Sequence, residues 1–270
     1  MTRRLNLRTI LRLFPLVISG FIGTSCQKVI DVDLNSAAPQ IVIEANVSDQ
    51  PGPDTVLISQ TVNFDQTNTF PPVSGARILI SDNAGNTDTL SEPAPGTYIT
   101  SHLQGTPGRT YTIDVSVNGK SYVASSTMPP PVNIDSLTLE NLTFGRNSRQ
   151  VIDVHFKDPA GSANYYRFVE ERNGIRLNFI FLIDNRVQEG DNITSILFAD
   201  DDTLFSGDIM TVLLERIDKN VYNYFTTARE ISNQGGAQLA SPTNPPSNFS
   251  NGALGCFSAY AVRSKSIIIP

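Results

Sequence analysis

Apolar and polar residues alternate with a period of two along most of the chain. The clearest run covers 110–117, where the pattern places four side chains on one buried strand face: Tyr111, Ile113, Val115 and Val117. Asn118 and Gly119 come next, and both residue types tolerate the positive φ of a hairpin turn. The run therefore predicts a β-hairpin that returns over 122–127.

Further strand signals recur at intervals of roughly ten residues, with Gly, Asn, Asp or Pro between them. They cover 41–47, 56–62, 77–80, 136–142, 151–156, 164–170, 175–182 and 210–214. Short strands at this spacing favour antiparallel sandwiches. Prolines 129–131 predict a stiff connector, because proline cannot donate to a strand ladder. We therefore expect a mainly β chain of two consecutive Ig-like or fibronectin-like β-sandwich halves, over 40–130 and 131–270.

One helix is expected in the second half, near 218–234. Asp218 is placed to cap it, because its carboxylate can accept from the free N–H groups of the first turn. Apolar residues then recur at helical spacing and predict one buried face: Val221, Tyr224, Phe225, Ala228 and Ile231. Gly235 and Gly236 would end the helix.

The first 25 residues have the pattern of an export signal. Four arginines are the only charges before Cys26, and an apolar run and the small residues 23–25 follow them. The apolar run is about 10 residues, whereas a membrane span needs about 20. A cysteine after small residues resembles the lipobox of bacterial lipoproteins, in which the thiol is acylated. We expect lipidation at Cys26, a polar tether over 26–39 and attachment to the lipid bilayer; an unacylated secreted protein is the alternative.

Charge excludes one class of partner. The chain carries 20 Lys and Arg against 26 Asp and Glu, a formal net charge of -6. Removal of residues 1–25 takes away four arginines and leaves 16 basic against 26 acidic residues, a net of -10. Nucleic-acid binding needs clustered basic residues, so no nucleic-acid partner is expected.

Residues suited to catalysis are few. His102 and His155 are the only imidazoles, no G-x-S-x-G motif occurs, and Cys256 is the one cysteine left after Cys26. His155 falls on the polar face of its strand, and Cys256 is expected to be a small buried side chain. We therefore expect no enzyme, no metal site and no cofactor.

Two ligand-binding alternatives stay open at this point. The acidic residues near 200–202, with Glu189, Asp191 and Asp208, are hard oxygen ligands of the kind Ca²⁺ prefers, although they do not match a calcium-loop spacing. An aromatic group could stack on a glycan: Tyr165, Tyr166, Phe168, Phe179 and Phe181. The period of two places half of that group in the core.

Two sets of surface residues are candidates for modification or contact. Asp-Ser or Asp-Thr before an aliphatic residue resembles the O-glycosylation acceptor of exported Bacteroidota proteins, and it occurs at Thr55, Thr89, Ser136 and Thr203. The loop 241–255 has three prolines and no charge. It either covers a sandwich edge or contacts a partner through Asn244, Pro245, Pro246, Asn248 and Asn251.

The same loop carries a family resemblance. Residues 240–255 and the following Phe257-Ser258-Ala259-Tyr260 resemble the closing signature of a Bacteroidota lipoprotein family, domain of unknown function 4249. The resemblance extends to the lipobox, 42–45, 129–130, 158–159 and 164–167; it departs at Cys256, where an aromatic residue is expected. Members are often encoded beside TonB-dependent receptors, and no catalytic residues carry over. The resemblance implies an outer-membrane lipoprotein, periplasmic or surface-facing, that assists such a receptor; a glycan- or calcium-binding module is the alternative.

Overall fold

The structure is a computed structural model, and it describes residues 38–63, 69–144, 147–161, 163–184, 190–197, 204–233 and 244–270. Contacts group Ala38–Pro270 into one compact unit. Strands dominate it, and the described part of the chain contains one helix, so the expected mainly β class with a single helix in the second half is confirmed.

The N-terminal strands form two sheets that face each other across an apolar core. β3, β4, β7 and β8 make a four-stranded sheet in the order β4-β3-β7-β8, while β1, β2, β5 and β6 belong to a larger one. Their bounds are β1 Ile41–Ser48, β2 Thr55–Gln60, β3 Arg77–Asp82, β4 Thr87–Thr89, β5 Ser91–Ala94, β6 Thr97–Ile99, β7 Thr110–Val117 and β8 Lys120–Thr127.

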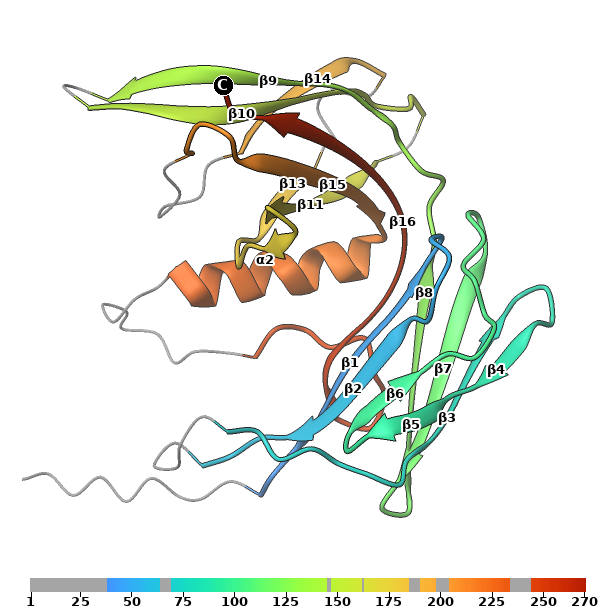
Figure 1. Ribbon diagram of the computed structural model, residues 1–270. Helices are drawn as coiled ribbons and strands as arrows, with labels where there is room; N and C mark the ends of the chain where they lie inside the picture. The colour runs from blue at the N-terminus through green and yellow to red at the C-terminus, as the bar shows by residue number, and fades with distance from the viewer. Residues whose placement is uncertain are drawn as a thin grey trace, which may run out of the picture. The chain divides into compact units, whose positions relative to one another are not determined.

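The C-terminal strands also form a sandwich-like pair of layers, seen at the top of Figure 1. β9, β10 and β14 make a three-stranded sheet that packs on β11, β13 and β15 through a second apolar cluster. The bounds are β9 Ile134–Phe144, β10 Asn147–Lys157, β11 Tyr165–Arg172, β12 Ile175–Arg176, β13 Phe181–Asp184, β14 Asn192–Leu197 and β15 Ile209–Ile217. The helix α2, Lys219–Asn233, follows β15 and contacts β11, β13 and the last strand.

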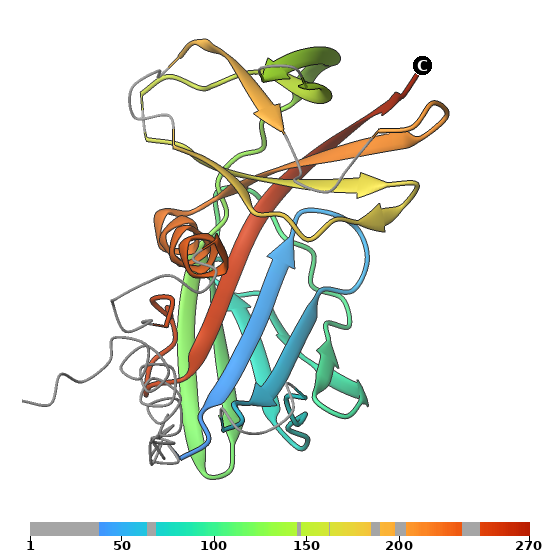
Figure 2. The same cartoon turned by 90° about the vertical axis from the view of Figure 1, so that its left-hand side faces the viewer.

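The last strand, β16 (Leu254–Ile268), belongs to both groups of strands. Its first half pairs with β1 in parallel, from Val42–Leu254 to Ser48–Tyr260. Its second half pairs with β15 antiparallel, from Arg216–Ala261 to Ile209–Ile268. Figures 1 and 2 show it running as one long bent strand through the molecule. The larger sheet therefore has the order β12-β11-β15-β16-β1-β2-β6-β5, with β13 on β11 as the ninth strand among the described residues.

Gly255 permits the close approach of β1 and β16. Its φ is +95°, in the region that favours glycine, and a Cβ there would overlap the carbonyl oxygen of Ile43. No other residue type fits this position without a shift of the β1 backbone.

The alternation of apolar and polar residues predicts the strands of the N-terminal half well. The four residues expected on the buried face of β7 are at most 5% exposed, and Asn118 and Gly119 turn with φ of 51° and 73°. The prediction was wrong in two places. The expected strand over 175–182 is two short strands, β12 and β13, and Ile231 of the helix is 37% exposed, because α2 packs through its first half. The division at residue 130 stays a prediction.

Candidate functional site

Where the partner strand of β16 changes, side chains form hydrogen bonds with the backbone N–H and carbonyl groups along its edges. Before β15 begins, Asn248 bonds the Phe257 peptide twice, through Nδ2 to the carbonyl oxygen at 2.7 Å and through Oδ1 from the N–H at 2.9 Å. Two residues on, the Ala259 N–H donates to Ser126 Oγ at 2.9 Å. These contacts imitate a strand ladder, so no peptide group is left buried and unpaired there.

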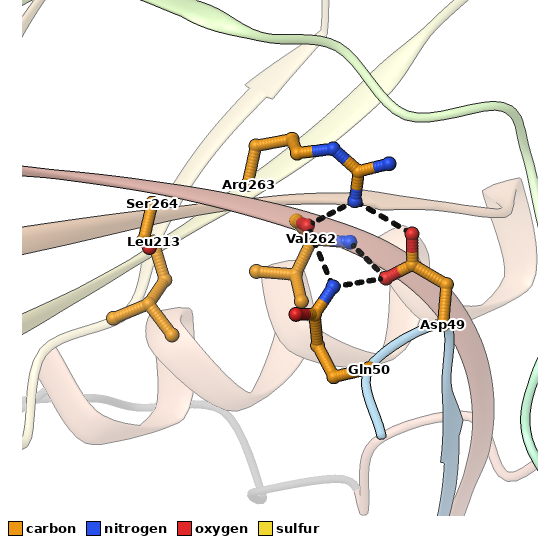
Figure 3. Close-up of a pocket in the computed structure, with 6 residues that line it drawn as sticks. All are labelled: Asp49, Gln50, Leu213, Val262, Arg263 and Ser264. Carbon is orange, nitrogen blue, oxygen red and sulfur yellow. Dashed lines mark hydrogen bonds and ion pairs between the residues drawn. The ribbon is translucent and has the colours of Figure 1, made fainter.

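The opposite edge of β16 is closed in the same way where β1 ends, and this is the candidate site (Figure 3). The Val262 N–H donates to Asp49 Oδ1 at 3.0 Å, and Gln50 Nε2 donates to the Val262 carbonyl at 3.2 Å. Arg263 Nη1 lies 2.6 Å from Asp49 Oδ2 and 2.6 Å from that same carbonyl oxygen. The β1–β2 loop is thereby fastened to the middle of the shared strand.

These groups border an open, mostly polar pocket of about 410 Å³, which Leu213 and Ser264 complete. Burial opposes ionisation of Asp49, but the hydrogen bonds from Val262 and Arg263 outweigh it and hold the pKa of Asp49 below its usual value. Asp49 is therefore a carboxylate at neutral pH, and its two oxygens are already occupied by protein donors.

A second pocket, of about 480 Å³, is lined by residues 51–53 of the same loop, Ser91 and 99–104. Asp88 organises this wall, because its Oδ2 accepts the backbone N–H groups of Ser101, His102 and Leu103, each at 2.9 Å. The exposed His102 ring lies 3.6 Å from the other carboxylate oxygen. The Asp88 carboxylate therefore holds the loop that carries His102.

Asp54 closes the β1–β2 loop from within. Its Oδ1 accepts the Ser48 N–H at 3.0 Å, while Oδ2 is buried without a hydrogen-bond partner. Burial raises the pKa of Asp54 to about 6, against the lowering effect of the Ser48 hydrogen bond. The loop thus holds one carboxyl group, Asp49, whose pKa is lowered and another, Asp54, whose pKa is raised.

Four residues of the C-terminal half form a buried polar network. Asn164 joins an arginine to a carboxylate: its Oδ1 accepts from Arg216, and its Nδ2 donates to Asp158 at 3.0 Å. The Tyr166 hydroxyl donates a hydrogen bond to the same Asp158 oxygen, and burial raises the pKa of Tyr166. Arg216 also donates to the Pro130 carbonyl at 3.0 Å, so this network fastens the proline connector to β15.

The helix cap joins the two halves as well. Asp218 Oδ1 accepts the N–H groups of Asn220 and Val221 at 2.8 and 3.0 Å, which confirms the expected cap. Its Oδ2 accepts from Ser126 Oγ on β8.

Cys256 is buried in the cluster beneath α2, as expected, and burial raises the pKa of its thiol to about 12. A thiol so protonated is a poor nucleophile.

The predicted contact loop lies partly on the β8 edge. The Ser250 N–H donates to the Val123 carbonyl at 2.8 Å, and Asn251 Nδ2 donates to the Ser121 carbonyl at 2.7 Å. With Asn248 on Phe257, two of the five loop residues bond to strands. Asn244 and Pro246 are exposed, and Pro245 is half-buried. The described part of this loop thus covers a sandwich edge.

The other candidates are scattered over the surface. Thr89 is exposed, Thr55 and Ser136 are half-buried, and Cys26 and Thr203 lie outside the described residues. His155 lies between two hydroxyl groups, with Nε2 2.8 Å from Thr138 Oγ1 and Nδ1 3.0 Å from Thr194 Oγ1. This is the polar strand face predicted for it.

The aromatic residues do not form the expected stacking platform, and most of the acidic group lies outside the described residues. Tyr166 and Phe168 are fully buried core residues, so the aromatic group offers no shared platform. Asp208 pairs with Arg172 at 2.7 Å and Asp191 is exposed, while residues 189 and 200–202 lie outside the described residues. Within the described ranges, no group of three or more His, Cys, Asp or Glu side chains could hold a metal, and no helix is long and apolar enough to cross a membrane.

Comparison with known families decides the relationship. A family model described as Domain of unknown function (DUF4249) matches residues 27–266. The chain belongs to this DUF4249 family. Three residues of the polar network, Asp158, Asn164 and Tyr166, are among those that carried the resemblance, and so is Pro130, which Arg216 binds in this DUF4249 chain. No curated protein matches the chain.

One solved structure that matches this DUF4249 chain is described as "Structure of Yersinia pseudotuberculosis adhesin InvE". The identity is 18% and the TM-score 0.22, and the match covers 66% of this chain and 55% of the adhesin chain. The chain thus spans about half the length of that structure.

Proposed function

We propose that this protein is an outer-membrane-anchored lipoprotein of the cell envelope that binds or assists a partner protein and has no catalytic activity of its own. The observation that carries the proposal is Cys26, which follows a basic, apolar and small-residue pattern, while the family match begins at the very next residue. Both observations support a mature chain that starts at this cysteine.

The polar groups inside the protein support a binding role. Asp49, Asp88, Asp158 and Asp218 each accept hydrogen bonds that hold loops, strands or the helix in place. Both ring nitrogens of His155 face hydroxyl groups, and Cys256 is buried. Because these groups hold the fold together, we propose that recognition takes place at surface loops and strand edges. A TonB-dependent receptor is the first partner to test, on the strength of the family resemblance.

The anchor is tested by the two cysteines of the chain, which provide a matched pair of variants. Cys26→Ala should lose incorporation of labelled palmitate and leave the membrane fraction, while Cys256→Ala should keep both. Palmitate label that persists in Cys26→Ala, or that is lost in Cys256→Ala, would contradict the anchor. Protease treatment of whole cells would then show which side of the membrane the protein faces.

The partner is tested with the acylated protein, by capture from detergent-solubilised envelopes. Recovery of a TonB-dependent receptor with wild-type protein and with Cys256→Ala supports the proposal. Saturable binding to a glycan or to Ca²⁺ without any envelope partner would favour the ligand-binding alternative instead.

A further inference from the structure

The last residues of β16 differ from the rest of the strand in the hydrogen bonding of one edge. From Leu254 to Tyr260 the edge pairs with β1, and at Val262 the side chains of Asp49 and Gln50 take the place of β1. Beyond Val262, the sheet order places no strand on this side among the described residues, and only β15 remains as a partner.

The direction of the peptide groups follows from two fixed points. Val262 points its N–H and carbonyl toward Asp49 and Gln50, on the β1 side. Ile269 points both groups the other way, since it accepts from the Gly207 N–H at 2.8 Å and donates to the Asp208 carbonyl at 2.9 Å. Peptide groups alternate along a strand, and the pairing of β15 with β16 has no register shift. Ser264, Ser266 and Ile268 therefore point away from β15.

These three residues form what we term the open edge. None of their backbone groups takes part in a hydrogen bond outside the strand ladders of the described chain. All three are exposed, and the apolar Ile268 is 67% exposed. A row of free N–H and carbonyl groups at strand spacing is complementary to one kind of occupant, another extended chain.

Charge indicates what kind of chain fits. The end of β16 carries Arg263 and Lys265 and no acidic residue. Arg263 is paired with Asp49, but exposed Lys265 donates only to the Asp135 carbonyl at 2.6 Å and has no carboxylate partner in the described chain. A second copy would bring its own Arg263 and Lys265 to the same place. An acidic segment is the better complement.

We propose that the open edge binds an extended, acidic segment of a partner protein, which adds to the large sheet as a strand beside Ser264–Ile268 and continues the position that β1 leaves at Val262. This proposal deepens the proposed binding function and rests on it. Backbone pairing supplies the affinity, and Lys265 selects for carboxylates on the incoming strand.

The test uses the full mature protein in detergent and two labelled synthetic peptides, Thr-Glu-Val-Glu-Val-Glu-Thr and its counterpart with Lys in place of Glu. Ser266→Pro removes the N–H at the centre of the open edge without touching the ladder to β15, and Ser266→Ala is the matched control that keeps this N–H. The acidic peptide should bind wild type and Ser266→Ala alike, and Ser266→Pro about tenfold more weakly or worse, a difference of about 1.4 kcal/mol.

Amide hydrogen exchange provides the second measurement. In the free protein, the Ser264, Ser266 and Ile268 amides should exchange fast and those of Lys265 and Ile267 slowly, and the acidic peptide should slow the first three. The proposal is overturned if these three amides are already slow, if the peptide does not bind, or if Ser266→Pro binds it as well as wild type. Dimers that Ser266→Pro dissolves would show that a second copy is the occupant. Palmitate label at Cys26 is measured separately, so failure of the lipid-anchor proposal can be distinguished from failure of the open-edge proposal.

Discussion

The two groups of strands bury different kinds of residues. The N-terminal group has an apolar core, with Ile43, Val56, Ile78, Ile80 and Ile113 at most 1% exposed, and the charged side chains that it buries are the carboxylates of Asp54, Asp82 and Asp88. The C-terminal group buries carboxylates together with an arginine: Asp158 is 1% exposed, Glu215 3% and Arg216 8%. Burial raises the pKa of Glu215, and Arg167, 3.2 Å away, opposes the shift.

This difference shows how each group is held. Apolar burial is non-directional and tolerates small rearrangements, whereas a buried ion needs its partners in place. The polar contacts of the C-terminal group also reach across to the other group, at Pro130 and Ser126. We infer that hydrophobic burial stabilises the N-terminal group, while hydrogen bonds fix its attachment to the C-terminal one.

The largest expected effect comes from breaking the buried network. Arg216→Ala leaves Asn164 Oδ1 and the Pro130 carbonyl without their donor, and it leaves the buried Asp158 carboxylate without the positive charge that Asn164 joins to it. Removing one partner of a buried pair of opposite charges costs about 3–5 kcal/mol. The free energy of unfolding from urea titration is the measurement. The exposed Arg77→Ala on β3 is the control and should stay within about 0.5 kcal/mol of wild type. Equal losses in the two variants would contradict the role of the network.

A substitution at the shared strand should have the next largest effect. Gly255→Ala strains a positive φ and drives a methyl group into the Ile43 carbonyl, so we expect a loss of about 3 kcal/mol. Gly252→Ala is the matched control, because its φ of +75° is strained in the same way but nothing lies within 4 Å of the new Cβ. Its loss should be roughly 1–2 kcal/mol. Thermal unfolding of both variants would reveal whether the close approach matters.

The smallest effect concerns pH and the β1–β2 loop. The folded pKa of Asp54, about 6, exceeds the usual 3.8, so the folded protein binds this proton more tightly. The contribution of Asp54 to the free energy of unfolding should therefore rise as the pH falls from about 6 to about 4, and this contribution should stay constant outside that window. Asp54→Asn should stabilise the protein by about 1–3 kcal/mol at pH 7.5 and by nothing below pH 4.

Asp49→Asn should change the free energy of unfolding in the opposite direction to Asp54→Asn. The pKa of Asp49 is lowered in the folded protein, so its carboxylate stabilises the fold above the ordinary pKa, and this contribution is lost as the pH falls through the folded value. If both asparagine variants shift stability in the same direction at pH 7.5, the contrast between the two carboxylates is wrong.

Sequence periodicity predicts local elements and fails where partners are distant. The alternation in β7 and the Asp218 cap depend on neighbouring residues, and both are confirmed. β16 was not among the predicted strands, because its first half is buried on both faces and lacks the alternation of apolar and polar residues. Its two partners lie more than 200 and about 50 residues away in sequence, and no local pattern indicates them.

The candidate site was missed for the same reason. Asp49 and Gln50 look like ordinary turn residues, and their role depends on Val262 and Arg263, which periodicity cannot bring to them. The edge-covering interpretation of the last loop could be predicted, because asparagine side chains carry both a donor and an acceptor and can imitate a peptide group.

The central claim is that β16 makes the two groups one folding unit, and a fragment of residues 27–130 tests it most directly. This fragment lacks Phe249, Ala253, Phe257, Ala259 and Ala261, which belong to the N-terminal core. A ¹H–¹⁵N correlation spectrum should show the narrow dispersion of an unfolded chain, and the wide dispersion of a folded one once residues 244–270 are joined to it by a Gly/Ser linker. A folded spectrum from 27–130 alone would contradict the claim and establish the boundary at residue 130 as that of an independent domain.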